Sequence, residues 1–277
     1  MIDSPCALAP AMGHVLCKAA DEAVMPRFQR LAEGDIEEKS PGDLVTIADR
    51  EAEAIIAEGL KGLRPQARFV GEEACAADPS RLQGLGQGEV WIVDPIDGTS
   101  NFATGRVPFA MMAALLRDGE VVAACILDPL NGSLLVAEKG AGTWCDGKRV
   151  NAPTAPCPPR ALSSCTGIIS DFQMPPASQP EVAQLVERVA EALPTQRCAG
   201  AEYPLIASGA RDFALYWRTL VWDHAPGVLI LEEAGGRAAR LDGTAYRADD
   251  RGGAILLAHT PDIWDQAASL LAGMLAG

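Results

Sequence analysis

Hydrophobic residues recur at helical spacing in residues 7–33, where apolar side chains four positions apart fall close to one face. The charged segment that follows, residues 34–42, is predicted to be a loop. A second helical pattern covers residues 47–61. Thr46 precedes it and Asp49 stands three residues later, a spacing that resembles a capping box with a shorter acid. The chain is therefore expected to begin with two helices.

Strand patterns come next, in two apolar runs at residues 68–71 and 89–93. Between residues 109 and 150 the pattern becomes hairpin-like, because further apolar runs are separated by short turn sequences. These turns are Asp118-Gly119, Asn131-Gly132 and Asp146-Gly147. The pattern predicts an antiparallel sheet.

The second half of the chain has a different pattern. Four prolines within residues 151–160 mark the predicted boundary. Helical patterns lie at residues 180–193, 201–209, 223–234 and 262–275, and strand patterns at residues 213–216 and 254–258. The predicted class is α+β, with an antiparallel-rich α+β half over residues 1–150 and an α/β half over residues 151–277.

Composition narrows the kind of protein. The chain has 277 residues, 48% of them hydrophobic, with 23 Lys+Arg against 37 Asp+Glu and a net charge of −14. This apolar content is enough for a packed core, in two domains or one large one. The acid excess argues against binding to nucleic acid or to an anionic membrane. No apolar run approaches the roughly 20 residues of a membrane span, and no signal peptide is recognisable, so a cytoplasmic location is expected.

Eight cysteines and three histidines complete the inventory of possible soft metal ligands. The cysteines lack a CxxC pair and the histidines lie far apart in the sequence. Reduced, mostly buried thiols are therefore expected rather than a zinc site.

One acidic cluster follows the apolar strand at residues 89–93. Asp94 and Asp97 are three residues apart around a turn, and the carbonyl of Ile96 lies between them. Carboxylate and carbonyl oxygens are the ligands that Mg²⁺ prefers. The amides of Gly98 and Thr99 come directly after and could face a phosphate. The alternative is a solvated turn, but buried carboxylates need compensation, and a metal ion supplies it.

Similar acidic residues stand at two other predicted element ends. Glu72 follows the strand at residues 68–71, and Asp223 begins the helix at residues 223–234. A metal centre beside a phosphate-binding turn is the arrangement used for metal-assisted phosphoryl hydrolysis.

Together these motifs resemble the inositol monophosphatase family, whose members are Mg²⁺-dependent, lithium-sensitive phosphatases. Relatives of that family include fructose-1,6-bisphosphatases and 3′(2′),5′-bisphosphate nucleotidases. The resemblance rests on Gly42-Asp43-Leu44-Val45-Thr46 with Asp49, Gly71-Glu72-Glu73, Asp94-Pro95-Ile96-Asp97-Gly98-Thr99-Ser100-Asn101-Phe102, Gly200-Ala201, Trp222-Asp223 and Glu233-Ala234-Gly235-Gly236. These motifs occur in the family's order and span roughly residues 40–240.

The resemblance implies a role for each matching residue. Glu72, Asp94 and the Ile96 carbonyl would hold one Mg²⁺; Asp94, Asp97 and Asp223 would hold a second. Glu72 would also help to hold a third ion. Asp49 and Thr99 would orient and deprotonate the attacking water, with Glu72 counted among the catalytic residues. The implied substrate-binding residues are Asp97, Gly98, Thr99, Gly200, Ala201, Glu202 and Asp223.

The chain departs from the family where the substrate is selected. Inositol-specific members carry a glutamate where this chain has Tyr216, so an acceptor for sugar hydroxyls is missing. Glu202 could replace it, could meet a substrate amine as in histidinol phosphate, or could pair with Arg211 or Arg218. Few basic residues are found near the motifs, although a nucleotide bisphosphate would call for them.

The resemblance implies a layered αβαβα sandwich with the site between the two halves. The expected activity is Mg²⁺-dependent hydrolysis of a small polyol-type phosphate, such as inositol-1-phosphate, by an activated water. Alternatives are histidinol phosphatase, a phosphatase for fructose 1,6-bisphosphate or a 3′,5′-bisphosphate nucleotide, and an inactive metal-binding regulator. Two to three Mg²⁺ ions, a small phosphorylated metabolite and a homodimer are the expected cofactors, ligand and assembly.

Overall fold

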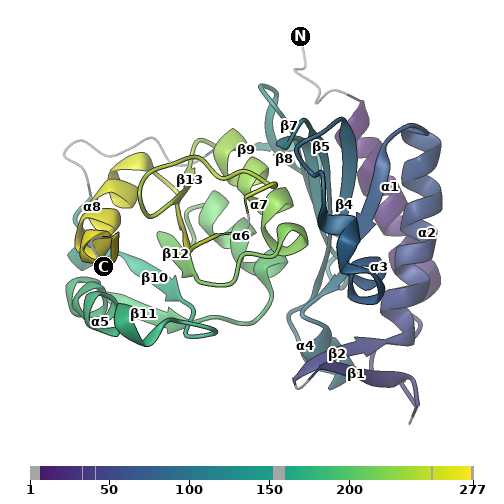
Figure 1. Cartoon of the computed structure of the whole chain (residues 1–277), viewed down its shortest axis with the longest axis horizontal. Coiled ribbons are helices and arrows are strands. Elements are labelled where there is room, and N and C mark those ends of the chain that lie inside the picture. Colours follow the sequence, from purple (N-terminus) through teal and green to yellow (C-terminus); the bar gives the residue numbers. More distant parts are fainter. Residues whose placement is uncertain (1–6, 33, 41, 152–159, 251, 276–277) are drawn as a thin grey trace.

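Two β-sheets and three layers of helices alternate through the molecule (Figure 1). The computed structural model describes residues 7–32, 34–40, 42–151, 160–250 and 252–275. Most of the proline-rich boundary predicted at residues 151–160 lies outside these ranges, so the division into two halves stays a prediction. No helix in the described part of the chain is long and apolar enough to cross a membrane.

The larger sheet has seven strands in the order β3-β4-β5-β6-β7-β8-β9. Their bounds are β3 Arg68–Gly71, β4 Glu89–Asp97, β5 Ala110–Arg117, β6 Glu120–Asp128, β7 Ser133–Glu138, β8 Gly142–Cys145 and β9 Lys148–Val150. From β4 onward all neighbours are antiparallel, which confirms the predicted hairpins. β4 and β5 are buried on both faces, as their nearly continuous apolar runs require.

Helices cover both faces of this sheet. On the outer face lie α1 (Leu8–Ala19), its π-helical continuation (Ala20–Val24) and α2 (Ile47–Leu63). On the inner face lie α6 (Ala199–Ala207) and α7 (Val221–Glu233), which also pack against the second sheet. One hydrophobic core therefore joins the two sheets through these helices.

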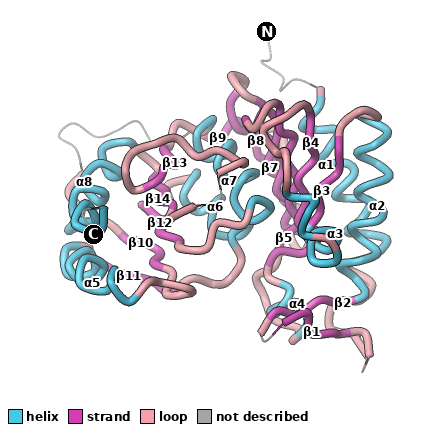
Figure 2. Tube along the Cα trace, viewed as in Figure 1, coloured by secondary structure: helices cyan, strands magenta, loops and turns pink. Residues whose placement is uncertain are grey.

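The second sheet has five strands in the order β11-β10-β12-β14-β13. They are β10 Thr166–Ile169, β11 Glu191–Pro194, β12 Phe213–Tyr216, β13 Arg237–Arg240 and β14 Ile255–Ala258. The helices α5 (Gln179–Arg188) and α8 (Pro261–Leu271) cover its far face, and α8 runs on into a short 3₁₀ turn. The order of layers is thus α, β, α, β, α, as the resemblance implied (Figure 2).

Several predicted boundaries were wrong. The segment at residues 34–42 is not a loop, because β1 (Ile36–Ser40) pairs with β2 (Asp43–Thr46) as an antiparallel ribbon. Its side chains are mostly exposed and charged, so the strand lacks the apolar alternation that would have identified it. The first helical segment ends at Val24 rather than residue 33, and Gln29 beyond it has a left-handed backbone with φ 58°.

The second half of the chain also differs from the predicted secondary structure. The helix predicted over residues 180–193 ends at Arg188, and the last four of those residues include most of β11. The strands β10 and β13 were missed altogether. Their sequences, Thr-Gly-Ile-Ile and Arg-Ala-Ala-Arg, lack the continuous apolar run that identified the equally short strands β12 and β14.

Candidate active site

The C-terminal end of β4 forms the centre of a cavity of about 180 Å³. Residues from both halves of the chain line it, including Glu72, Asp94, Ile96, Asp97, Gly98, Thr99 and Asp223. These residues come from the start of α3 (Glu72–Ala77), from β4, from the start of α4 (Thr99–Ala103) with the glycine before it, and from the start of α7. The ribbon β1–β2, the end of β12 and the loops after β10, β11 and β12 supply most of the rest of the lining. The structure therefore gathers in one place every metal ligand predicted from the sequence.

Glycines shape the backbone at two of these points. Gly98 has φ 86°, a left-handed conformation, and a Cβ there would lie 3.0 Å from the carbonyl oxygen of Pro108. At Gly71 a Cβ would lie 2.2 Å from Glu53 Oε2. Glu53 needs this space because its carboxylate accepts the backbone N–H groups of Glu73 and Ala74. Its bonds hold the start of α3, and so Glu72, against α2.

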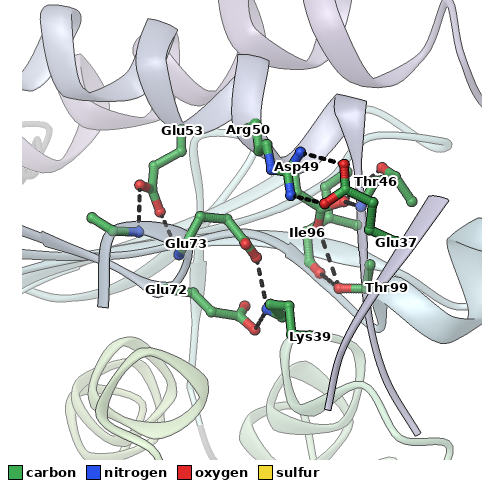
Figure 3. Close-up of polar contacts among 11 residues, drawn as sticks. Glu37, Lys39, Thr46, Asp49, Arg50, Glu53, Glu72, Glu73, Ile96 and Thr99 are labelled. Atoms are coloured by element: carbon green, nitrogen blue, oxygen red, sulfur yellow. Dashed lines mark hydrogen bonds and ion pairs between the residues drawn. The ribbon is translucent and has the colours of Figure 1, made fainter. Parts of the chain in front are cut away.

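Asp49 and Thr99 form a hydrogen-bonded pair beside the carboxylates (Figure 3). Asp49 Oδ2 accepts from the backbone N–H of Thr46 at 2.8 Å and from its hydroxyl at 2.6 Å, which confirms the predicted capping box. This leaves Asp49 Oδ1 facing Thr99 Oγ1 at 3.3 Å. The Thr99 hydroxyl also lies 2.8 Å from the Ile96 carbonyl oxygen, so one hydrogen has two available acceptors.

Burial makes Asp49 a proton acceptor suited to neutral pH. Its side chain is fully buried, and this desolvation raises its pKa to about 7 against the lowering effect of the two Thr46 bonds. The nearby charges of Glu73 and Glu72 raise the pKa further. A general base works best when its pKa lies near the working pH.

The two central aspartates are carboxylates held without enough compensating charge. Asp94 is 2% exposed, and its Oδ1 has no hydrogen-bond partner among the residues that the structure describes. Burial, followed by the charges of Glu72, Asp97 and Asp223, raises its pKa well above the usual value. Asp97 accepts the Gly200 N–H at 2.5 Å, yet burial raises its pKa to about 7. Buried carboxylates of this kind are stabilised by cations.

The donor set fits a hard divalent cation, although the side chains do not form a ready-made cage. In the described ranges no three His, Cys, Asp or Glu residues are grouped as ligands of one ion. Figure 3 shows that Glu72 is paired with a lysine instead: Lys39 Nζ on β1 lies 2.9 Å from both Glu72 Oε1 and Glu73 Oε1. Mg²⁺ needs only one or two carboxylates together with waters and substrate phosphate oxygens. Carboxylates plus the Ile96 carbonyl satisfy that requirement.

Known proteins are similar to this chain in sequence and in fold. The profile of the inositol monophosphatase family matches residues 10–272. The chain belongs to the inositol monophosphatase family. An inositol-1-monophosphatase of Rhizobium meliloti is 33% identical over 208 residues, which cover 74% of this chain and 75% of that protein. A fructose-1,6-bisphosphatase/inositol-1-monophosphatase of Thermotoga maritima is 30% identical over 216 residues, covering 76% and 77%.

The fold agrees with the family assignment. The crystal structure of the extragenic suppressor protein suhB from Bartonella henselae superposes with a TM-score of 0.79 at 26% identity, covering 96% of this chain and 98% of the other. Like other members of the inositol monophosphatase family, the chain is a phosphoric monoester hydrolase.

The residues predicted to select the substrate lie partly behind the cavity wall. Gly200, Ala201 and Glu202 are not among the lining residues, and Glu202 is fully buried. Its carboxylate accepts from the Thr195 hydroxyl at 3.0 Å, the Gln196 N–H and the Tyr216 hydroxyl. Neither Arg211 nor Arg218 is among its hydrogen-bond or ion-pair partners in the described chain. Glu202 is therefore placed to fix the ring of Tyr216, which does line the cavity.

His224 packs edge-on against Tyr216 inside the inositol monophosphatase fold and makes two hydrogen bonds of its own. Its Nδ1 lies 3.0 Å from the Tyr203 hydroxyl and its Nε2 lies 3.0 Å from the Arg218 carbonyl oxygen. Burial lowers its pKa to about 4, so the ring is neutral at pH 7. A neutral ring with its proton on Nε2 satisfies both contacts, since Nδ1 then accepts from Tyr203.

Sequence reasoning missed part of the lining. Phe172, Arg197 and Ser170 contribute to the cavity but belong to none of the quoted motifs. Two basic residues, Arg197 and Arg218, line the cavity, and Arg197 was not considered in the sequence analysis. They stand in loops whose approach to Asp94 depends on the second sheet, so their spacing in the sequence carries no signal.

Proposed function

We propose that this protein is a Mg²⁺-dependent phosphomonoesterase that hydrolyses a small phosphorylated metabolite with an activated water. The observation that carries the proposal is the cavity at the end of β4, where the unpartnered Asp94 Oδ1 lies in the same site as the Asp49–Thr99 pair. The buried Asp94 carboxylate places negative charge that needs a cation. The Asp49–Thr99 pair supplies a proton acceptor in the same site.

The residues suited to hold two to three Mg²⁺ ions are Glu72, Asp94, the Ile96 carbonyl, Asp97 and Asp223. When bound, Mg²⁺ supplies positive charge for the phosphate oxygens and lowers the pKa of water. Four carboxylates without cations would repel a phosphate ester, and this explains why activity should depend on the metal.

The protein groups then position water and phosphate. When the Ile96 carbonyl is engaged as a ligand, the Thr99 hydroxyl has Asp49 Oδ1 as its remaining acceptor. With its hydrogen directed to Asp49, the Thr99 oxygen can accept a hydrogen bond from the attacking water. The water proton can then move by way of Thr99 to Asp49. The amides of Gly98 and Thr99 are the groups we assign to the phosphate.

The substrates named for the relatives define the first test. Phosphate release from inositol-1-phosphate should require Mg²⁺ and should be lost on chelation with EDTA. Asp94→Asn should remove it, whereas Asp21→Asn, at an exposed position on the first helical segment, should leave it unchanged. Absence of Mg²⁺-dependent release from a panel of inositol, histidinol, fructose and adenosine phosphates would refute the proposal.

Lithium supplies a second test of the same site. Li⁺ should inhibit by competing with the second Mg²⁺, and activity that persists in a large excess of Li⁺ would count against this assignment of the ligands. The cytoplasmic location and the homodimer remain predictions.

A further inference from the structure

The two arginines of the cavity come from neighbouring strand ends in the second sheet. β10 runs parallel to both β11 and β12, so their C-terminal ends meet at one edge. Phe172 follows β10, Arg197 follows β11 and Arg218 follows β12, and all three line the cavity.

The topology makes this edge a natural ligand site. β10 lies between β11 and β12 in the sheet. After β10 the chain forms β11 on one side of it and then β12 on the other side. The helix α5 between β10 and β11 covers the outer face, whereas α6 between β11 and β12 covers the inner face. Ligands of open α/β sheets bind outside the carboxyl ends of the strands at such a switch point.

The arginine side chains share one aromatic ring instead of acidic partners. The guanidinium carbon of Arg197 lies 5.4 Å from the ring centroid of Phe172, and that of Arg218 lies 5.6 Å away. Neither guanidinium forms an ion pair with a carboxylate in the described part of the chain, although the protein has an excess of acids. Phe172 itself is 39% exposed and Arg197 is also exposed, so this part of the lining is open to solvent.

The cavity lining therefore carries both signs of charge. Asp94, Asp97 and Asp223 supply carboxylates, where the cations and the scissile phosphate belong, and Arg197 and Arg218 supply two guanidinium groups. Tyr216 lies in the wall with its hydroxyl donated to Glu202, so this carboxylate is turned away from the substrate. Glu202 is therefore not an acceptor for the substrate, whereas the guanidinium groups of Arg197 and Arg218 offer positively charged donors that an anionic group can match.

We propose that Arg197 and Arg218 form a subsite for a second anionic group, so that the preferred substrate carries a phosphate or carboxylate besides the ester that is hydrolysed. Guanidinium groups bind both anions through paired N–H donors. The inference rests on the proposed phosphomonoesterase function and extends it to the class of substrate.

Matched pairs of substrates test it. Fructose 1-phosphate and fructose 1,6-bisphosphate differ by the second phosphate, and glycerol 2-phosphate and glycerate 2-phosphate differ by a carboxylate. In the presence of Mg²⁺, the wild-type protein should have a kcat/KM about tenfold or more higher for the doubly anionic member of at least one pair. The pair that shows the preference identifies which anion the subsite takes.

Substitutions of the two arginines test whether they form this subsite. Arg197→Ala and Arg218→Ala should each reduce the preference ratio by about tenfold, through KM more than kcat. Arg218→Glu should reverse it and Arg218→Lys should restore part of it. Arg188→Ala, at an exposed position at the end of α5, is the control and should keep the wild-type ratio.

Each result has a distinct meaning. Equal kcat/KM within both pairs, or a ratio unaffected by the arginine substitutions, overturns the subsite while leaving the phosphatase assignment intact. No Mg²⁺-dependent release from the four esters overturns the subsite alone if inositol-1-phosphate is still hydrolysed, and overturns the proposed function as well if the wider phosphate panel also gives none.

Discussion

Replacing Asp97 by asparagine should stabilise the metal-free protein while removing its activity. Burial raises the pKa of Asp97 to about 7 from an ordinary value of 3.8. The folded state therefore binds this proton more tightly than the unfolded state. The resulting contribution to stability is complete below pH 3.8 and is lost as the pH rises through about 7. Asparagine resembles the protonated acid and keeps an oxygen that can accept the Gly200 N–H.

The size of the effect follows from the pKa difference. Each unit corresponds to about 1.4 kcal/mol, so the variant should exceed the wild-type protein by about 4 kcal/mol at pH 8 and by about 2 kcal/mol at pH 5. The advantage should therefore grow with pH. Mg²⁺ should reduce this stability difference. An ion that binds only the folded state stabilises it, and the variant, which has lost one of the metal-binding carboxylates, should gain less from Mg²⁺ than the wild-type protein.

Urea unfolding at pH 5 and pH 8, in EDTA and in saturating Mg²⁺, measures these differences. Asp21→Asn is the control, since it removes an exposed carboxylate and should show no such pH-dependent gain. Phosphate release measured on the same samples should be absent for Asp97→Asn. A variant less stable than the wild-type protein in EDTA at pH 8, or an advantage that does not shrink at pH 5, would refute the reasoning.

Three further predictions concern the groups around the carboxylates. Thr99→Val and Asp49→Asn should each lower kcat by about 100-fold or more while Mg²⁺ still binds in calorimetry; loss of Mg²⁺ binding would instead make the pair structural. Between pH 7 and pH 4, the stability of His224→Gln relative to the wild-type protein should rise by about 3 kcal/mol in urea unfolding, because the buried carboxyls contribute equally to both proteins and cancel in the difference. The pKa of His224 is lowered to about 4 from 6.5, so its contribution is complete above pH 6.5 and is lost as the pH falls; a difference that does not change with pH would exclude this residue as the cause. Tyr216→Phe should destabilise the fold by about 1–3 kcal/mol at pH 8, because it removes a partner of the buried Glu202 carboxylate. Adding Glu202→Gln should recover part of that loss in the same assay, and no recovery would count against the buried charge as its cause.

The sequence predicted well those features that depend on neighbouring residues. The capping box of Thr46 and Asp49 is confirmed, since its bonds span three positions of one helix. The turn at Asp118 and Gly119 is also confirmed, with φ values of 50° and 81° that suit a hairpin between β5 and β6. The ribbon at residues 36–46 was missed because its exposed, charged strand is held by backbone pairing rather than by an apolar pattern.

The role of a conspicuous residue was harder to predict. Glu202 suggested a substrate contact because it follows a family motif, yet its side chain is fully buried and bonded to Thr195 and Tyr216. Arg197 carried no motif at all, yet it lines the cavity. A side chain's direction depends on the helix and strand that hold it, and α6 turns Glu202 into the protein while the loop before it presents Arg197.

By itself, the sequence determined the order of most secondary elements and indicated the carboxylates that we propose as Mg²⁺ ligands, because capping, turn geometry and carboxylate chemistry are set by local residue types. Only the tertiary structure decided how these groups act together. Asp223 reaches Asp94 because α7 packs between the two sheets, and burial among like charges, not residue identity, raises the pKa of Asp94. The arginine pair exists because three parallel strands end at one edge. Residue types fix which chemistry is available, and packing fixes the distances, charges and solvent exclusion that make it usable.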